Sequence, residues 1–336
     1  MMYIAGDVVT QEGFTKGYLG LRDDHIVDRG EGTPPKKPDY YGYILPSLIN
    51  AHTHLGDSFI RQKKRSLPKN IEQLVAPPFG IKHQLLEQAS EQEVSRGILK
   101  SLKIMQKTGT SLFVDFREGG LTGLKQLKKA IQATSINSII LSRPSKLTYH
   151  KEEIDALLDN SQGIGVSSIA DWSYAEIEKI AKHTKQKKKI FSLHVSENKR
   201  EDIDTVLDLK PDFLIHALKA TESDLLCIKQ ENIPIVLCPR SNAFFGLQPS
   251  YALLKKLKIQ LMLGTDNAML SSPNIIDELK FMYSQTSLFS LHELFKMITY
   301  TPRKALNSVD CIQGLNLTSP VVVLDKQSLR PVYISK

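Results

Sequence analysis

The chain has 336 residues, 41% hydrophobic and 24% charged, a balance that is ordinary for a globular protein. No stretch approaches the roughly 20 apolar residues that cross a bilayer, and the first residues lack the pattern of a secretory signal, so we expect a cytoplasmic protein without a membrane span. The net charge of +8 comes from basic residues spread along the chain, which argues against a nucleic-acid site.

The two ends of the chain share a β-prone pattern. Residues 3–29 contain short β-prone runs with Gly and Asp turns, and Val321 to Leu324 form another such run near the other end. We predict that residues 1–42 and 310–336 form one small accessory β domain.

Between the ends, strand-like and helix-like segments alternate. Each short apolar run is followed by a polar turn and then, in most cases, by apolar residues at three- and four-residue spacing. The runs are Tyr43–Asn50, Thr110–Phe116, Ile136–Leu141, Gly163–Ile169, Lys189–His194, Asp212–His216, Ile233–Cys238 and Gln260–Thr265. The clearest helical segments are Glu91–Lys107, Leu124–Ala133, Tyr174–His183, Glu222–Gln230 and Ala252–Leu257. Eight such units favour an α/β fold, a closed (β/α)₈ barrel over residues 43–309.

Two further features qualify this pattern. Residues 59–90 contain Pro68, Pro77 and Pro78 and no immediate long helix, so we predict a long loop over the active face. The three cysteines, Cys227, Cys238 and Cys311, are an odd number without CxxC spacing, which argues against a disulfide framework or a thiolate zinc site.

Metal-compatible side chains follow four of the predicted strands. His52 and His54 come just after the first run, and residues two apart in a strand project from the same face. His194 and His216 end the fifth and sixth runs, and Asp266 directly follows the eighth. Barrel enzymes do their chemistry at the carboxyl ends of the strands, so we expect these groups to converge on one cation.

Glu197, three residues after His194, is placed to exchange a proton with a water molecule that such a cation activates. The alternative is an acidic residue that only stabilises the start of a helix.

These residues resemble those of a known family. The stretches LPSLINAHTHLGD, LHVSEN, IHALKATESDLL, IPIVLCPRSNAFFG and MLGTDNAML are similar to the strand ends of the amidohydrolase superfamily, in its deaminase and chlorohydrolase-like branch. The resemblance implies a distorted TIM barrel with a β-sandwich-like accessory domain. It also implies that His52, His54, His194 and Asp266 bind one zinc or iron ion. His216, Glu197 and Asp266 then match the catalytic residues, with His216 holding water or substrate and Glu197 moving the proton.

Other site properties follow from the same residues. The fourth-strand segment GIGVSSIADWSY offers no Lys, Glu or Cys to bridge a second metal, so we expect one divalent ion, zinc in the first place, with iron or manganese as alternatives. Substrate contacts are predicted for side chains that follow barrel strands, namely Arg240, Asn242, Asp57 and Arg117. For Asn242 a turn is the alternative role, and for Arg117 an ion pair with Glu118.

The leading functional hypothesis is hydrolytic deamination of a purine, pyrimidine or related nucleoside. The second hypothesis is hydrolysis of a cyclic amide, or removal of chloride, by the same site. A binding or scaffold protein that lost catalysis is the third. We expect a small-molecule substrate and neither a nucleic-acid nor a membrane partner, and a homodimer is compatible with the sequence.

Overall fold

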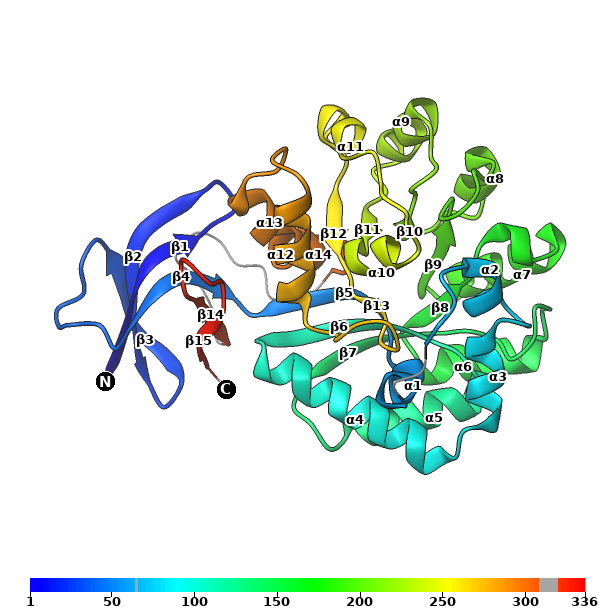
Figure 1. Cartoon of the computed structure of the whole chain (residues 1–336), viewed down its shortest axis with the longest axis horizontal. Helices are drawn as coiled ribbons and strands as arrows, with labels where there is room; N and C mark the ends of the chain where they lie inside the picture. The colour runs from blue at the N-terminus through cyan, green and yellow to red at the C-terminus, as the bar shows by residue number, and fades with distance from the viewer. Residues whose placement is uncertain (64–65, 308–319, 336) are drawn as a thin grey trace.

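The computed structural model describes residues 1–63, 66–307 and 320–335, and it contains two β-sheets. The smaller sheet joins the two ends of the chain, and both termini lie at it (Figure 1). Its strand order is β15-β14-β4-β1-β2-β3. The strands are β1 (Met2–Val9), β2 (Phe14–Arg22), β3 (His25–Glu31), β4 (Tyr40–Pro46), β14 (Val321–Leu324) and β15 (Pro331–Ile334). The predicted accessory β unit made by both chain ends is confirmed.

The larger sheet is parallel throughout, with the strand order β12-β11-β10-β9-β8-β7-β6-β5-β13. Its strands are β5 (Leu48–His54), β6 (Thr110–Arg117), β7 (Asn137–Ser142), β8 (Gly163–Val166), β9 (Ile190–Val195), β10 (Phe213–His216), β11 (Ile235–Leu237), β12 (Leu261–Leu263) and β13 (Asp266–Asn267).

The two edges of this sheet belong to one stretch of chain. β12 pairs with β11, and three residues later β13 pairs with β5, while Thr265 N donates to His52 O at 2.9 Å. Residues 261–267 therefore act as the eighth strand and close the sheet. The predicted (β/α)₈ barrel is confirmed, and its distortion lies in this interrupted strand.

One predicted strand is divided between the two sheets. The apolar run Tyr43–Asn50 continues past Pro46, where β4 ends opposite Val321, and β5 begins two residues later at Leu48. Both halves are buried, so hydrophobicity alone does not reveal the change of sheet. The domain boundaries at 42/43 and 309/310 stay predictions, and the second lies outside the described residues.

Helices cover the outside of the barrel (Figure 1), and some lie at the carboxyl ends of its strands. They are α1 (Ser58–Gln62), α2 (Ile71–Leu74), α3 (Ile81–Gln88), α4 (Glu91–Lys107), α5 (Gly120–Ile131), α6 (Lys151–Asn160), α7 (Tyr174–Gln186), α8 (Ile203–Asp208), α9 (Glu222–Gln230), α10 (Pro239–Phe244), α11 (Tyr251–Leu257), α12 (Ile275–Gln285), α13 (Leu291–Met297) and α14 (Tyr300–Ala305).

Local sequence explains the sharpest helix boundaries. α4 and α9 have the predicted limits, and each begins with a capping box, Ser90 with Glu93 and Thr221 with Asp224. In a capping box the two residues satisfy backbone N–H groups that the first helical turn leaves without partners.

The segment after β5 differs from its prediction. Residues 59–90 were predicted as a long loop, but they contain most of α1 and all of α2 and α3. These helices are short, and the prolines between them and their many polar residues hide the helical period in the sequence. The segment does lie at the carboxyl ends of the strands, since Ile71, Val75 and Lys82 line the cavity described below.

The barrel interior is filled by its own apolar cluster, which includes Phe116, Phe213, Val236 and Cys238. Cys238 and Cys227 are both free thiols, and Cys311 lies outside the described residues.

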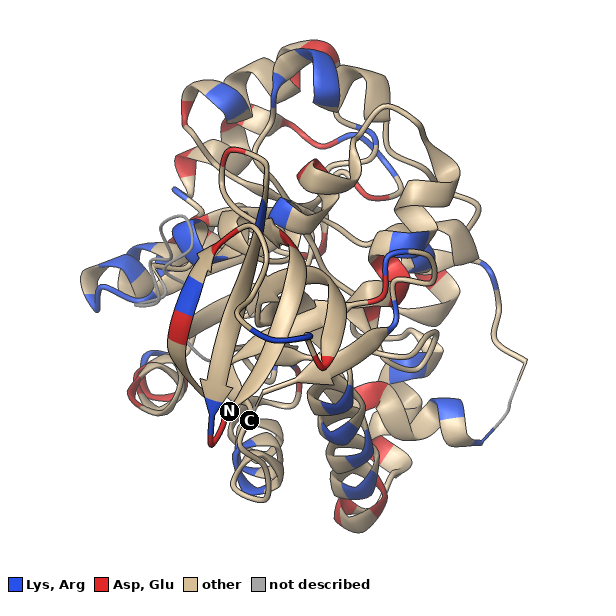
Figure 2. Ribbon diagram, turned by 90° about the vertical axis from the view of Figure 1, so that its left-hand side faces the viewer, with Lys and Arg blue, Asp and Glu red and all other residues tan. Residues whose placement is uncertain are grey.

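The described residues include no helix that is long and apolar enough to cross a membrane. Figure 2 shows Lys and Arg interspersed with Asp and Glu over the helices and strands of that view.

Candidate active site

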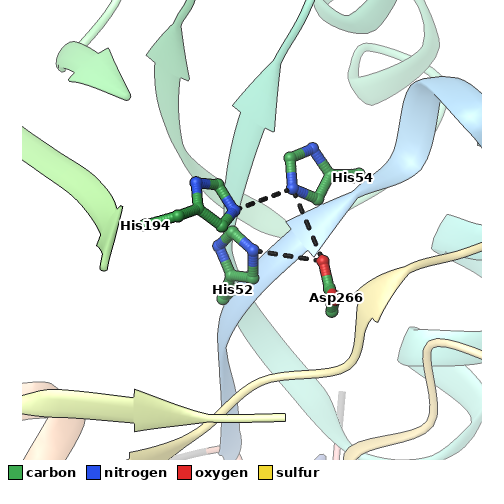
Figure 3. A group of neighbouring side chains, drawn as sticks. All are labelled: His52, His54, His194 and Asp266. Atoms are coloured by element: carbon green, nitrogen blue, oxygen red, sulfur yellow. Dashed lines mark hydrogen bonds and ion pairs between the residues drawn. The ribbon is translucent and has the colours of Figure 1, made fainter. Parts of the chain in front are cut away.

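Four side chains from three strand segments meet at the carboxyl end of the barrel. His52 and His54 lie on β5, His194 on β9 and Asp266 on β13, and one donor atom from each lies within 4.8 Å of the others (Figure 3). The register that pairs Asp266 with Thr53 places its carboxylate beside both β5 histidines. Asp266 Oδ1 lies 3.3 Å from His52 Nε2 and 3.5 Å from His54 Nε2. The structure thus brings together the four predicted metal ligands.

The hydrogen bonds of two histidines indicate what this group can hold. His54 Nδ1 lies 3.0 Å from Phe116 O, and His194 Nδ1 lies 2.9 Å from Val166 O. A carbonyl oxygen only accepts, so each Nδ1 carries a proton and each neutral ring has its lone pair on Nε2. These two Nε2 atoms face each other at 3.3 Å, where lone pairs repel unless a cation lies between them.

Two further atoms of the group lack a hydrogen-bond partner among the described residues: His52 Nε2 and Asp266 Oδ1. Burial lowers the pKa of His52 to about 3, so this imidazole is neutral at physiological pH. Burial alone would raise the pKa of Asp266, but its close contact with His52 and the other surrounding imidazoles bring it well below the usual range. Three neutral imidazoles and one carboxylate fit a divalent transition metal such as zinc.

Glu197 and His216 form the second part of the site. His216 ends β10, and its Nε2 lies 3.4 Å from Glu197 Oε1. Asn242 Nδ2 donates to His216 Nδ1 at 3.1 Å and lies 3.4 Å from Glu197 Oε1. Since Nδ1 accepts this bond, a neutral His216 carries its proton on Nε2. Burial raises the pKa of Glu197 above the ordinary value, as suits a group that exchanges protons near neutral pH.

Asp266 belongs to both parts, because it also lies within 4.8 Å of donor atoms of Glu197 and His216. Its second oxygen, Oδ2, accepts a 2.5 Å hydrogen bond from Ser241 Oγ on α10. This bond leaves Oδ1 directed at the histidines.

Non-glycine residues with left-handed backbone mark the strand ends of the site. Ser196 has φ +45°, His216 has φ +76° and Asp266 has φ +55°. Such conformations are uncommon for L residues and recur at functional sites, although in this chain they also occur at turns such as Lys188 and Lys258.

The site opens into a cavity of about 320 Å³. Its walls come from the 71–82 segment, from the ends of β7 and β8, and from residues 194–201. The lining side chains include Val75, Lys82, Glu118, Arg143, Ser167, Asp171, Glu197, Arg200, His216 and Asp266.

The four predicted substrate residues lie in different surroundings, and none lines this cavity. Asp57 is fully buried, where it accepts from Met269 N at 2.8 Å, and burial raises its pKa to about 7. Arg117 donates to Gly123 O and Gln126 Oε1, both at 2.8 Å. The predicted contacts of Asp57 and Arg117 with substrate therefore have no support in the geometry.

The other two predicted substrate residues follow β11. Arg240 lies at α10, where its guanidinium is 3.6 Å from Glu278 Oε1 and its backbone N donates to Glu278 Oε2 at 2.9 Å. Asn242 is buried against His216 and Glu197, so it orients these two side chains rather than forming a turn alone.

Sequence reasoning missed Lys82, Glu118 and Arg143. The sequence suggests an ion pair of Glu118 with Arg117, but the Glu118 carboxylate lies against Lys82 and His54 instead, at 2.6 Å and 2.7 Å. Arg143 follows β7 and is 7% exposed, and its Nε has no hydrogen-bond partner among the described residues. Its position after a barrel strand was a usable signal. Lys82 gave none, because it lies in the segment predicted as a loop.

Gly264 permits a close backbone approach beside the ligand His52. A Cβ at Gly264 would lie 2.6 Å from His52 Cβ and 2.8 Å from His52 N. We expect Gly264→Ala to lower the free energy of unfolding by about 1–3 kcal/mol, because the eighth strand must move away from β5. Urea unfolding of the metal-free protein checks this. Gly13→Ala, where a Cβ meets nothing within 4 Å, is the matched control and should change stability by less than about 0.5 kcal/mol.

Comparison with known proteins agrees with this geometry. The model of the amidohydrolase family matches residues 43–310, which is most of the chain. The chain belongs to the amidohydrolase family. A putative aminohydrolase of Archaeoglobus fulgidus is 35% identical over 284 residues, covering 84% of this chain and 79% of that protein.

Two deaminases are also similar to this amidohydrolase. A 5-methylthioadenosine/S-adenosylhomocysteine deaminase of Caldicellulosiruptor saccharolyticus is 26% identical over 288 residues, covering 76% of this chain and 65% of that protein. Among solved structures, Helicobacter pylori aminofutalosine deaminase in complex with methylthio-coformycin superposes with a TM-score of 0.72 at 16% identity, covering 97% and 92% of the two chains. This last likeness concerns the fold.

Proposed function

We propose that this amidohydrolase is a mononuclear zinc enzyme that hydrolytically deaminates a purine, pyrimidine or related nucleoside. The observation that carries the proposal is the pair of Nε2 atoms of His54 and His194, 3.3 Å apart and both without a proton, beside Asp266 and at the floor of the cavity. His52, His54, His194 and Asp266 would hold the cation. A cation bound there lowers the pKa of a coordinated water toward about 7 and so supplies the nucleophile at neutral pH.

Glu197 transfers protons in this proposal, and His216 assists by hydrogen bonding. Glu197 takes a proton from the attacking water and returns it to the departing ammonia, so it acts first as base and then as acid. His216 donates a hydrogen bond from Nε2–H to a polar atom of the substrate or to the water, and Asn242 holds the imidazole in that tautomer. Asp266, with Ser241 on its outer oxygen, is oriented toward the same place.

The cavity supports a small heterocyclic substrate. Its volume of about 320 Å³ lies within the range of small-molecule sites. Arg143 offers an unpaired Nε in the wall and is our candidate for binding a polar substituent of the substrate. Among nucleosides we favour adenosine-like ones, because that is the kind of compound named for the deaminases to which the chain is similar.

A release assay tests the proposal. We expect zinc-loaded protein to release ammonia from one or more compounds in a panel of purines, pyrimidines, their nucleosides and 5′-substituted adenosines. Ring opening without ammonia would instead indicate a cyclic amide hydrolase, and chloride release from a chlorinated heterocycle a chlorohydrolase. No turnover by protein that binds no metal would favour a binding protein and would contradict the proposal.

A further inference from the structure

Lys82 is a buried lysine that connects three segments around the site. It is 2% exposed, and its ammonium lies 2.6 Å from Glu118 Oε1, 2.8 Å from Asn267 Oδ1 and 3.4 Å from Asp57 Oδ2. Lysine is almost never buried this deeply without paired charges. An ammonium group has three N–H donors, and here three acceptors lie around it.

Glu118 connects this lysine to a metal ligand. It follows β6, it is 5% exposed, and its Oε1 lies 2.7 Å from His54 Nδ1. A carboxylate has only acceptors, so this short approach requires the proton of His54 on Nδ1. The lone pair of His54 is thereby held on Nε2, which faces His194 and Asp266. A charged acceptor on the far nitrogen fixes a metal-binding imidazole in its productive orientation.

The other two partners of Lys82 lie beside further ligand-bearing backbone. Asn267 follows Asp266 directly and pairs with His54 in the β13–β5 ladder. Asp57 comes three residues after His54 and accepts from Met269 N, two residues beyond Asn267. The ammonium therefore lies between the ends of the two strands that carry three of the four ligands.

We propose that Lys82 and Glu118 are positioning residues of the cation site: Glu118 fixes His54, and Lys82, delivered by α3, holds Glu118. The 58–90 segment then has two tasks, since it forms a wall of the cavity and also sets how tightly the cation is bound. The inference rests on the proposed function, because it requires a cation at these ligands.

Zinc affinity of the metal-free protein, measured by competition with a chromophoric chelator, tests this pairing. We expect Glu118→Gln to raise the Kd for zinc by about tenfold or more, since a neutral amide oxygen is a weaker acceptor for Nδ1–H. Lys82→Met should also raise Kd, by a similar factor. Because Lys82 acts through Glu118, the double variant should bind zinc no more weakly than Glu118→Gln alone.

The matched control is Lys199→Met. Lys199 lines the same cavity but is exposed and pairs with Glu72 at the rim, so the same loss of charge should leave the zinc Kd unchanged. A second readout is the visible absorption spectrum of the cobalt-loaded protein. This spectrum should shift in Glu118→Gln and stay as in the parent protein in Lys199→Met. A general loss of stability would not produce such a shift.

Wild-type zinc affinity in both Glu118→Gln and the double variant would overturn the inference and would mean that the Phe116 carbonyl alone fixes His54. Lys82→Met leaves Glu118 and Asp57 without their lysine partner. If this variant does not fold, the zinc affinities of Glu118→Gln and of the double variant still test the inference. Failure of the parent protein to bind zinc would count against the proposed function itself, and so the two failures are distinguishable.

Discussion

Replacing Glu197 by glutamine is expected to lower kcat by about 10²–10⁴-fold while the cation stays bound. Glutamine keeps the shape of the side chain and its neighbours His216 and Asn242, but an amide neither takes a proton from water nor returns one to ammonia. The expected loss is in the chemical step, so kcat should fall much more than KM changes.

The measurement is steady-state ammonia release by the variant, together with elemental analysis of the same sample. Glu222→Gln, at an exposed carboxylate on α9 that pairs with Lys256, serves as control and should turn over normally. Full turnover by metal-loaded Glu197→Gln would show that another group moves the proton.

Loss of the cation should have the largest effect of all. Dialysis against a chelator is expected to abolish ammonia release, and one equivalent of zinc per chain should restore it. Asp266→Ala should not be rescued at the same zinc concentration, because it removes one of four ligands and the shared neighbour of Glu197 and His216. Two tightly held equivalents per chain would contradict the mononuclear site.

Thermal unfolding gives an independent readout of the same change. A cation that binds only the folded chain stabilises it by about 2.7 kcal/mol when its concentration is 100 times the Kd. The Tm of the parent protein should therefore rise with zinc concentration, whereas that of Asp266→Ala should change little.

The barrel and the cluster of metal-compatible groups followed from local sequence, for physical reasons. His52 and His54 share a face because strands alternate, and the carboxyl ends of parallel strands meet on one side of a barrel. The remaining ligands each end or directly follow a buried run, so their convergence required only that the barrel close.

What the sequence did not reveal depends on side-chain direction. Arg117 and Glu118 are adjacent, but the guanidinium of Arg117 turns toward α5 while the carboxylate of Glu118 reaches His54. Asp57 follows the ligand strand as a substrate residue would, yet it is buried, bonded to Met269 N and not part of the cavity wall. Lys82 enters from a segment without clear periodicity, and its partners Asp57, Glu118 and Asn267 are all far from it in sequence.

The left-handed backbone at Ser196, His216 and Asp266 has a consequence for engineering this protein. Each such residue costs about 1–3 kcal/mol, which the rest of the barrel must offset. Left-handed residues also occur on the opposite rim, at Lys188, Lys210, Asn232 and Lys258, where glycine could ease the backbone. At His216 and Asp266, by contrast, glycine would delete a functional side chain. Efforts to make a more heat-resistant variant should therefore begin at the opposite rim and on the outer helices, where sequence can be optimised without sacrificing chemistry.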